Sequence, residues 1–253
     1  MIVYQCEDSL EGIFTAIYNA YEDKREHGDT RISLNGELFL FAEYVSVASD
    51  ERKACKVMKT LRSRFGEEDY LKICFALASC DPEKAQAVYQ TVVLGLSGRC
   101  AQGHLFDNLA NDWVHHVFTL ARNVGNEKHH LVEFVRFKEL ENGILFSKIG
   151  PKNNVVTFLM PHFSDRFPLE NFMIFDENRE LFGVHPAGKQ WYLMQGSIPA
   201  AGAEGWKLSG REQEYQELFR YFCHKIAIKE RENRELQRNM LPLRFQEYMI
   251  EFE

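Results

Sequence analysis

The sequence predicts an α+β protein with a mostly helical N-terminal half and an antiparallel β-meander of about five strands, packed by C-terminal helices. Three observations predict this class. Apolar residues recur at helical spacing through most of residues 1–125. Short apolar segments separated by turn residues follow in the first part of residues 126–253, and a long helical pattern closes the chain. Residues 1–125 and 126–253 form either two separate structural regions or one continuous domain.

The N-terminal half begins with an apolar run suited to a strand. Asp8, with Glu11 three residues later, fits a capping box and predicts a helix start. The segment "ELFLFAEYVSV" predicts a second strand, and "DERKACKVMKTLRSRFG" predicts a helix that begins at the cap residue Asp50 and ends at Gly66. Three more helices are expected over residues 67–79, 82–98 and 105–124.

The pattern changes near residue 133, where strand-like segments begin. We expect, in order, a hairpin over 134–150, a strand over 154–160, a short helical crossover over 161–168, a second hairpin over 171–186 and a strand over 189–194. No long helix separates these strands, so the pattern disfavours a parallel nucleotide-binding sheet.

A helical pattern then covers residues 209–241, and Pro242 should interrupt it before a last short helix over 243–251. One face of this long helix is apolar, and we expect it to pack on the sheet. Its members are Phe219, Phe222, Ile226, Leu236 and Met240.

Composition narrows the function classes. The net charge is −7, and residues 1–121 hold most of it, with 12 Lys and Arg against 18 Asp and Glu. Nucleic-acid binding would therefore need a local basic cluster. None of the six cysteines forms a CxxC pair, which argues against a zinc ribbon or an iron–sulfur motif. With no leader pattern and no apolar run of membrane-spanning length, we expect a cytoplasmic protein.

An arginine stripe is the clearest charge pattern. Arg231, Arg234 and Arg238 are spaced to share one face of the expected helix, and such a stripe suits a phosphate backbone. Acidic residues interleave with it, so a solvated surface face is the alternative.

Two further segments carry candidate nucleic-acid contacts. Lys189 and Trp191 would share a strand face, where a cation beside an aromatic ring suits a nucleotide, although a core Trp with a solvated Lys is equally compatible. Arg166 lies four residues after His162 and could join it on phosphate, or it could pair with Asp165.

Acid–base chemistry has five candidate side chains, and they would have to gather in one pocket. They are Glu127, His130, His162, Asp165 and His185. Glu127 and His130 form one ExxH pair, whereas a carboxylate-bridged metal site in a helical bundle needs two, so no metal is predicted. No nucleotide or cofactor motif is present, so no cofactor is predicted either.

Five long segments resemble a bacterial family of DNA-metabolism and DNA-repair proteins. They are "CEDSLEGIFTAIYNAY", "EKHHLVEFVRFKELENGILFSKIGPKNNV", "MPHFSDRFPLENFMIFD", "GVHPAGKQWYLM" and "IAIKERENRELQRNMLPLRFQEYM". Members of that family are usually encoded beside a predicted radical-SAM DNA modification or repair protein, and a related domain is joined to uracil-DNA-glycosylase-like domains. The resemblance implies a DNA setting and a radical-SAM partner, which would carry the iron–sulfur cluster. It supplies no catalytic residue.

Three functions remain open from the sequence. The first is a module that holds DNA, or a damaged or modified nucleotide, for a radical-SAM partner. The second is a nucleic-acid-processing enzyme that uses the histidine and carboxylate candidates. The third is a scaffold that binds the partner protein without touching DNA.

Overall fold

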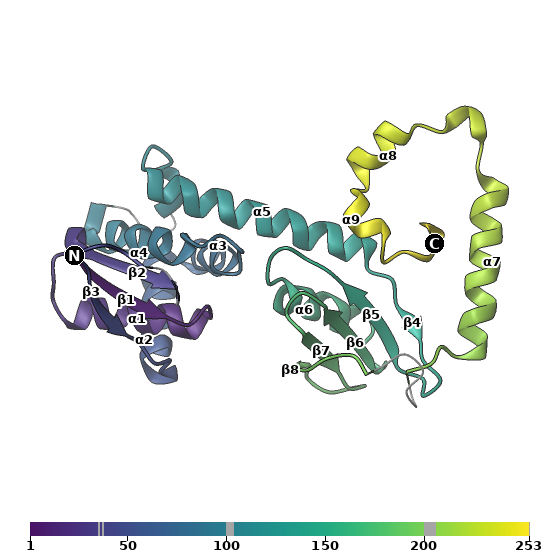
Figure 1. The fold of residues 1–253 in the computed structure, drawn as a ribbon, viewed down its shortest axis with the longest axis horizontal. Coiled ribbons are helices and arrows are strands. Elements are labelled where there is room, and N and C mark those ends of the chain that lie inside the picture. The colour runs from purple at the N-terminus through teal and green to yellow at the C-terminus, as the bar shows by residue number, and fades with distance from the viewer. Residues whose placement is uncertain (35, 37, 100–103, 200–205, 253) are drawn as a thin grey trace. The chain divides into compact units, whose positions relative to one another are not determined.

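The chain forms two compact units, Met1–Asn126 and Glu127–Glu253, each with its own sheet. The computed structural model describes residues 1–253 except 35, 37, 100–103, 200–205 and 253 (Figure 1). The boundary between the units falls within helix α5 (Asp112–Phe134). Within the described residues, no helix has the length and apolar character needed to cross a bilayer.

The N-terminal unit combines a small sheet with helices. Its elements are β1 (Ile2–Cys6), α1 (Leu10–Glu22), η1 (His27–Asp29), β2 (Thr30–Leu34), β3 (Glu43–Ser46), α2 (Glu51–Phe65), α3 (Glu67–Leu77), α4 (Lys84–Leu94), η2 (Gly95–Arg99), η3 (Leu105–Asp107) and the first part of α5. The helical character expected of this half is therefore only part of its architecture.

The sheet of the N-terminal unit is parallel, with strand order β2-β1-β3. The sequence did not predict a parallel sheet in this half, and it forms because α1 returns the chain so that β2 can run alongside β1 in the same direction. Strand β2 was not predicted. The strand expected at "ELFLFAEYVSV" is confirmed only at Glu43–Ser46, and Leu38, Leu40 and Phe41 before it are almost fully exposed.

Helix starts in this unit follow local capping. The N-cap of α1 is Ser9, not Asp8, because the Ser9 hydroxyl accepts the Gly12 N–H at 2.9 Å. The predicted cap at Asp50 is confirmed, since its carboxylate accepts the backbone N–H groups of Arg52 and Lys53. The predicted end of α2 at Gly66 is also confirmed, and its φ of 86° is a conformation that favours glycine.

The C-terminal unit places a five-stranded sheet before its last helices. After the end of α5, its elements are β4 (Lys138–Glu139), β5 (Leu145–Ile149), α6 (Val156–Arg166), β6 (Phe172–Asp176), β7 (Leu181–His185), β8 (Tyr192–Gln195), α7 (Gly210–Ile226), η4 (Lys229–Arg231), α8 (Arg234–Met240), α9 (Leu243–Gln246) and η5 (Ile250–Phe252).

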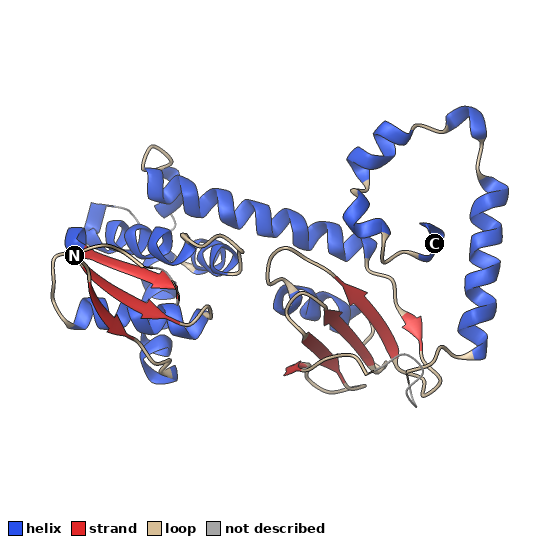
Figure 2. Cartoon of the chain, in the orientation of Figure 1, coloured by secondary structure: helices blue, strands red, loops and turns tan. Residues whose placement is uncertain are grey.

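This sheet is mixed and not a purely antiparallel meander. The strand order is β4-β5-β6-β7-β8, with β5 and β6 parallel and the other neighbours antiparallel (Figure 2). The strand expected over 154–160 is wrong, because Val156–Met160 form the first turns of α6. That helix is the crossover that returns the chain and makes β6 parallel to β5.

Helix α6 packs against the sheet at Gly183 in β7. A Cβ atom at this position would overlap the Met160 side chain and would lie 2.9 Å from Cγ1 of Val156. Glycine is therefore required at Gly183 by the close approach of the helix to the strand.

The long C-terminal helix expected over 209–241 is interrupted. Helix α7 ends at Ile226, the backbone at Ala227 is extended, and α8 starts from a new cap where Asn233 accepts the Leu236 N–H at 2.9 Å. The apolar residues expected to pack on the sheet do not do so. Phe219, Phe222, Ile226, Leu236 and Met240 are 38–68% exposed.

We expect Gly183→Val to lower the free energy of unfolding by about 1–3 kcal/mol, because the new methyl groups must displace Met160 and Val156 from a packed interface. Urea denaturation followed by circular dichroism measures this. Gly210→Ala is the control, because a Cβ there meets no atom within 4 Å. Equal stability of the two variants would contradict the packing argument.

Candidate nucleic-acid interface

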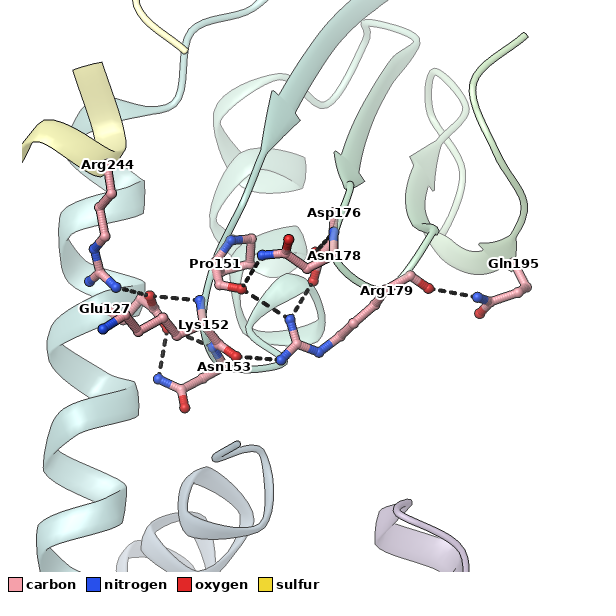
Figure 3. Close-up of polar contacts among 9 residues, drawn as sticks. All are labelled: Glu127, Pro151, Lys152, Asn153, Asp176, Asn178, Arg179, Gln195 and Arg244. Carbon is pink, nitrogen blue, oxygen red and sulfur yellow. Dashed lines mark hydrogen bonds and ion pairs between the residues drawn. The ribbon is translucent and has the colours of Figure 1, made fainter. Parts of the chain in front are cut away.

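Glu127 on α5 is a buried carboxylate with four donors (Figure 3). Its oxygens accept the backbone N–H of Lys152 at 3.0 Å and that of Asn153 at 2.9 Å. The Asn153 side-chain amide donates a third hydrogen bond at 2.7 Å, and Arg244 of α9 forms an ion pair at 2.8 Å. Both oxygens of Glu127 are engaged in these contacts. Glu127 therefore fixes the loop after β5 and helix α9 to one point of α5.

The same loop is held from its other side by the turn after β6. Arg179 donates to the carbonyl oxygens of Pro151 and Lys152, and Asn178 donates to that of Pro151 at 2.9 Å. Arg179 also pairs at 3.0 Å with Asp176, which is completely buried. Burial raises the pKa of Asp176, and the Arg179 guanidinium opposes that rise. The loop is therefore clamped between α5 and the sheet, as Figure 3 shows.

The end of the chain packs on the last turns of α5. Phe245 of α9 is buried, with its ring centroid 5.8 Å from that of His130 and 5.6 Å from that of Phe134. Arg136 pairs with Glu251 of η5 at 3.0 Å. These contacts hold η5 in place, and η5 forms one wall of a cavity.

The cavity lies between α7, η4, α8 and η5 and has a volume of about 820 Å³. Four basic side chains from three separate elements line it, namely Arg220, His224, Arg231 and Arg234. Two carboxylates, Glu232 and Glu251, also line it. Cationic side chains that converge on one concavity suit a phosphate-bearing ligand.

The charge balance of the cavity is positive. Glu251 is already paired with Arg136, which is not a lining residue. Arg231 and Arg234 form no ion pair with any residue that the structure describes. Their guanidinium groups thus keep their donors available for an anion.

The predicted arginine stripe is rearranged by the break after α7. Arg231 lies in η4, while Arg234 and Arg238 lie on α8, so the three do not share one helix face. Arg231 and Arg234 still converge on the cavity. Arg238 is exposed and is not among the lining residues.

The other predicted nucleic-acid contacts lie elsewhere. Lys189 and Trp191 precede β8, so they do not share a strand face as predicted. Lys189 is exposed in a turn in which its backbone N–H donates to the Pro186 carbonyl oxygen. Trp191 is half-buried. Arg166 ends α6 and lies over the ring of Phe167. None of these three residues lines the cavity.

The acid–base candidates serve packing and local pairing. His130 stacks on Phe134 at 5.9 Å, and His185 is buried, stacks on Phe172 at 4.7 Å and contacts the Glu170 carbonyl through Nδ1 at 3.0 Å. His162 is half-buried against Phe163, and Asp165 is exposed on the same helix. None of the five candidates, Glu127 included, lines the cavity.

Among the described residues, no group of three or more His, Cys, Asp or Glu side chains could hold a metal ion. Free thiols occur at Cys6, Cys55, Cys74, Cys80 and Cys223, while Cys100 lies outside the described residues.

The sequence analysis did not identify two of the four basic lining residues, Arg220 and His224. A signal was present, because Arg220, His224 and Ala227 are spaced four and three apart and so share a helical face.

A family model described as a domain of unknown function matches residues 82–251, which is more than half of the chain. This description assigns no activity and names no partner. No curated protein matches the chain.

We expect Glu127→Ala to lower the free energy of unfolding of the C-terminal unit by about 3 kcal/mol, because it leaves Arg244 and the loop amides without their acceptor. Urea unfolding followed by tryptophan fluorescence measures the loss. The control is Glu133→Ala on the same helix, where an exposed pair with His129 is removed and about 0.5 kcal/mol or less should change. Similar losses in both variants would show that Glu127 is not an anchor.

Proposed function

Since this chain belongs to the DUF4130 family, whose description leaves the activity open, we propose that it binds nucleic acid through the cavity between α7, η4, α8 and η5. In this proposal the protein acts in DNA metabolism or repair, and it presents DNA, or a damaged or modified nucleotide, to a radical-SAM partner. The observation that carries the binding step is the convergence of Arg220, His224, Arg231 and Arg234 on one cavity.

Phosphate is the ligand chemistry that these side chains favour. Arginine offers a planar fork of donors that matches two phosphate oxygens, and Arg231 and Arg234 can contact successive phosphates. The whole chain has a net charge of −7, so the attraction must come from this local cluster and not from the overall field. Binding that rests on a few phosphate contacts should weaken steeply with salt.

The cavity also offers apolar contacts. Leu236, Met240 and Phe252 lie among its lining residues, and the Phe252 ring is 39% exposed. An exposed aromatic ring beside cations suits a nucleobase attached to a bound phosphate. A volume of about 820 Å³ is within the range of small-ligand sites, which supports a nucleotide-sized segment as the unit that is held.

The accessory role is supported by the sequence resemblance to proteins encoded beside a radical-SAM enzyme. Under this proposal the partner supplies the iron–sulfur cluster and carries out the reaction, while this chain binds the DNA. A role on bacterial chromosomal DNA would place the protein in the cytoplasm.

A partner-binding scaffold without DNA contact is the second candidate. It is favoured by the large exposed apolar side chains of α7, which have the character of a protein-binding surface. A nucleic-acid-processing enzyme has less support, since its five candidate side chains are occupied in packing, in pairing or at the surface away from the cavity.

We expect the double variant Arg231→Glu/Arg234→Glu to weaken DNA binding at least roughly tenfold, since it replaces two phosphate contacts with repulsion. The measurement is fluorescence anisotropy with a labelled oligonucleotide over a salt series. The slope of log affinity against log salt should fall in magnitude by about 1.4–1.8.

Arg238→Glu is the control for that experiment, because it makes one such Arg-to-Glu change on α8 outside the cavity. It should change affinity by less than about threefold. Equal losses in the control and in the double variant, or wild-type protein that binds no DNA, would contradict the proposed site. Circular dichroism of each variant verifies that the fold is kept.

The scaffold alternative is separated by nuclease treatment. If DNA bridges the two proteins, capture of the radical-SAM partner by this chain should fall after nuclease digestion, as measured by pull-down with purified components. Capture that resists nuclease, together with no DNA binding by this chain alone, would favour the scaffold.

A further inference from the structure

Helix α7 carries a stripe of large apolar side chains that its own unit does not cover. Its members are Tyr215, Leu218, Phe219, Phe222 and Ile226, and they are 38–61% exposed. At about 100° per residue they fall within an arc of roughly 100°, which is the width of a buried helix face in a globular protein. We call these five residues the α7 stripe.

The α7 stripe is a different face of the helix from the one that packs and lines the cavity. Gln216 is the buried residue of α7, and Arg220 and His224 line the cavity. Their helical positions lie roughly 100–180° around the helix from Tyr215. A partner on the α7 stripe would therefore leave the basic cavity open.

We propose that the α7 stripe is a self-association surface, on which α7 of a second copy of this chain docks antiparallel about a two-fold axis. Tyr215, Phe219, Phe222 and Ile226 are spaced four, three and four apart, which is the spacing of the seam of a two-helix coiled coil. Antiparallel pairing sets Tyr215 against Ile226 of the partner subunit, and Phe219 against Phe222 of the partner subunit. Every contact then occurs twice, as a two-fold interface requires.

The charges beside the stripe favour a second copy in this direction. Glu214 and Lys225 flank it on the same side, near opposite ends of α7, and both are exposed. An antiparallel copy brings together the same flank of both helices and places Glu214 within two residues of the level of Lys225 of the partner subunit, twice over. Arg211 falls within the arc of the stripe at the start of α7, where it lies level with the chain beyond the end of the partner helix. The stripe and its flank are thus self-complementary.

The test is the oligomeric state of the full chain. Sedimentation velocity over a concentration series should show a monomer–dimer equilibrium, and Phe222→Glu should leave a monomer at every concentration. A wild-type monomer at all concentrations would overturn the proposal, and so would a dimer that Phe222→Glu leaves intact. Far-ultraviolet circular dichroism checks that α7 remains helical in the variant.

A charge swap tests the direction of pairing. Glu214→Lys and Lys225→Glu should each weaken the dimer by about tenfold, and the double variant should restore it. Glu217→Lys, which makes the same change on the opposite face of α7, is the control and should leave the dimer unchanged. Failure of the double variant to recover would overturn antiparallel pairing. DNA affinity of the Phe222→Glu monomer reports on the cavity separately, so the two proposals can fail independently.

Discussion

The buried carboxylate of Glu127 is the constraint on which the C-terminal unit depends. It accepts two backbone N–H groups and one side-chain amide from the loop after β5, and it pairs with Arg244 of α9. A carboxylate that is almost fully buried is tolerated only when its oxygens are engaged in this way. One side chain of α5 therefore fixes both the entry to α6 and the return of the chain end.

The basic cavity forms because the end of the chain packs back on α5. With α9 and η5 held on α5 by Arg244, Phe245 and the Arg136–Glu251 pair, the chain between Ile226 and Leu243 has to curve back from the end of α7 (Figure 1). Because the chain curves here, Arg231 lies in η4 and Arg234 lies in α8, yet both side chains line the same cavity. A straight helix would have placed the arginines along a ridge, where phosphate contacts are more exposed to solvent and to salt.

Local signals in the sequence predicted local structure well. The cap at Asp50 and the end at Gly66 rest on contacts between neighbouring residues, and the structure has both. The segment "NVVTFLM" was misread as a strand because a short apolar run can be buried equally well in a helix or in a strand. Strand β2 has alternating apolar residues at Ile32 and Leu34, but the polar residues between and before them make the segment resemble a loop, so the strand was not predicted. The prediction of a purely antiparallel sheet failed for the same reason, since a crossover helix returns the chain so that the next strand runs parallel to the one before it.

The sequence by itself determined the mixture of helices and strands, both ends of α2 and the arginine-rich C-terminal region. These properties depend on composition and on spacings of a few residues. Only the tertiary structure decided that Glu127 is a structural anchor, that the five acid–base candidates lie outside the basic cavity, and that Arg220 and His224 join Arg231 and Arg234 there. Such groupings depend on where the chain turns back, and that is fixed by contacts such as Glu127 with Arg244, which lie more than a hundred residues apart in the sequence.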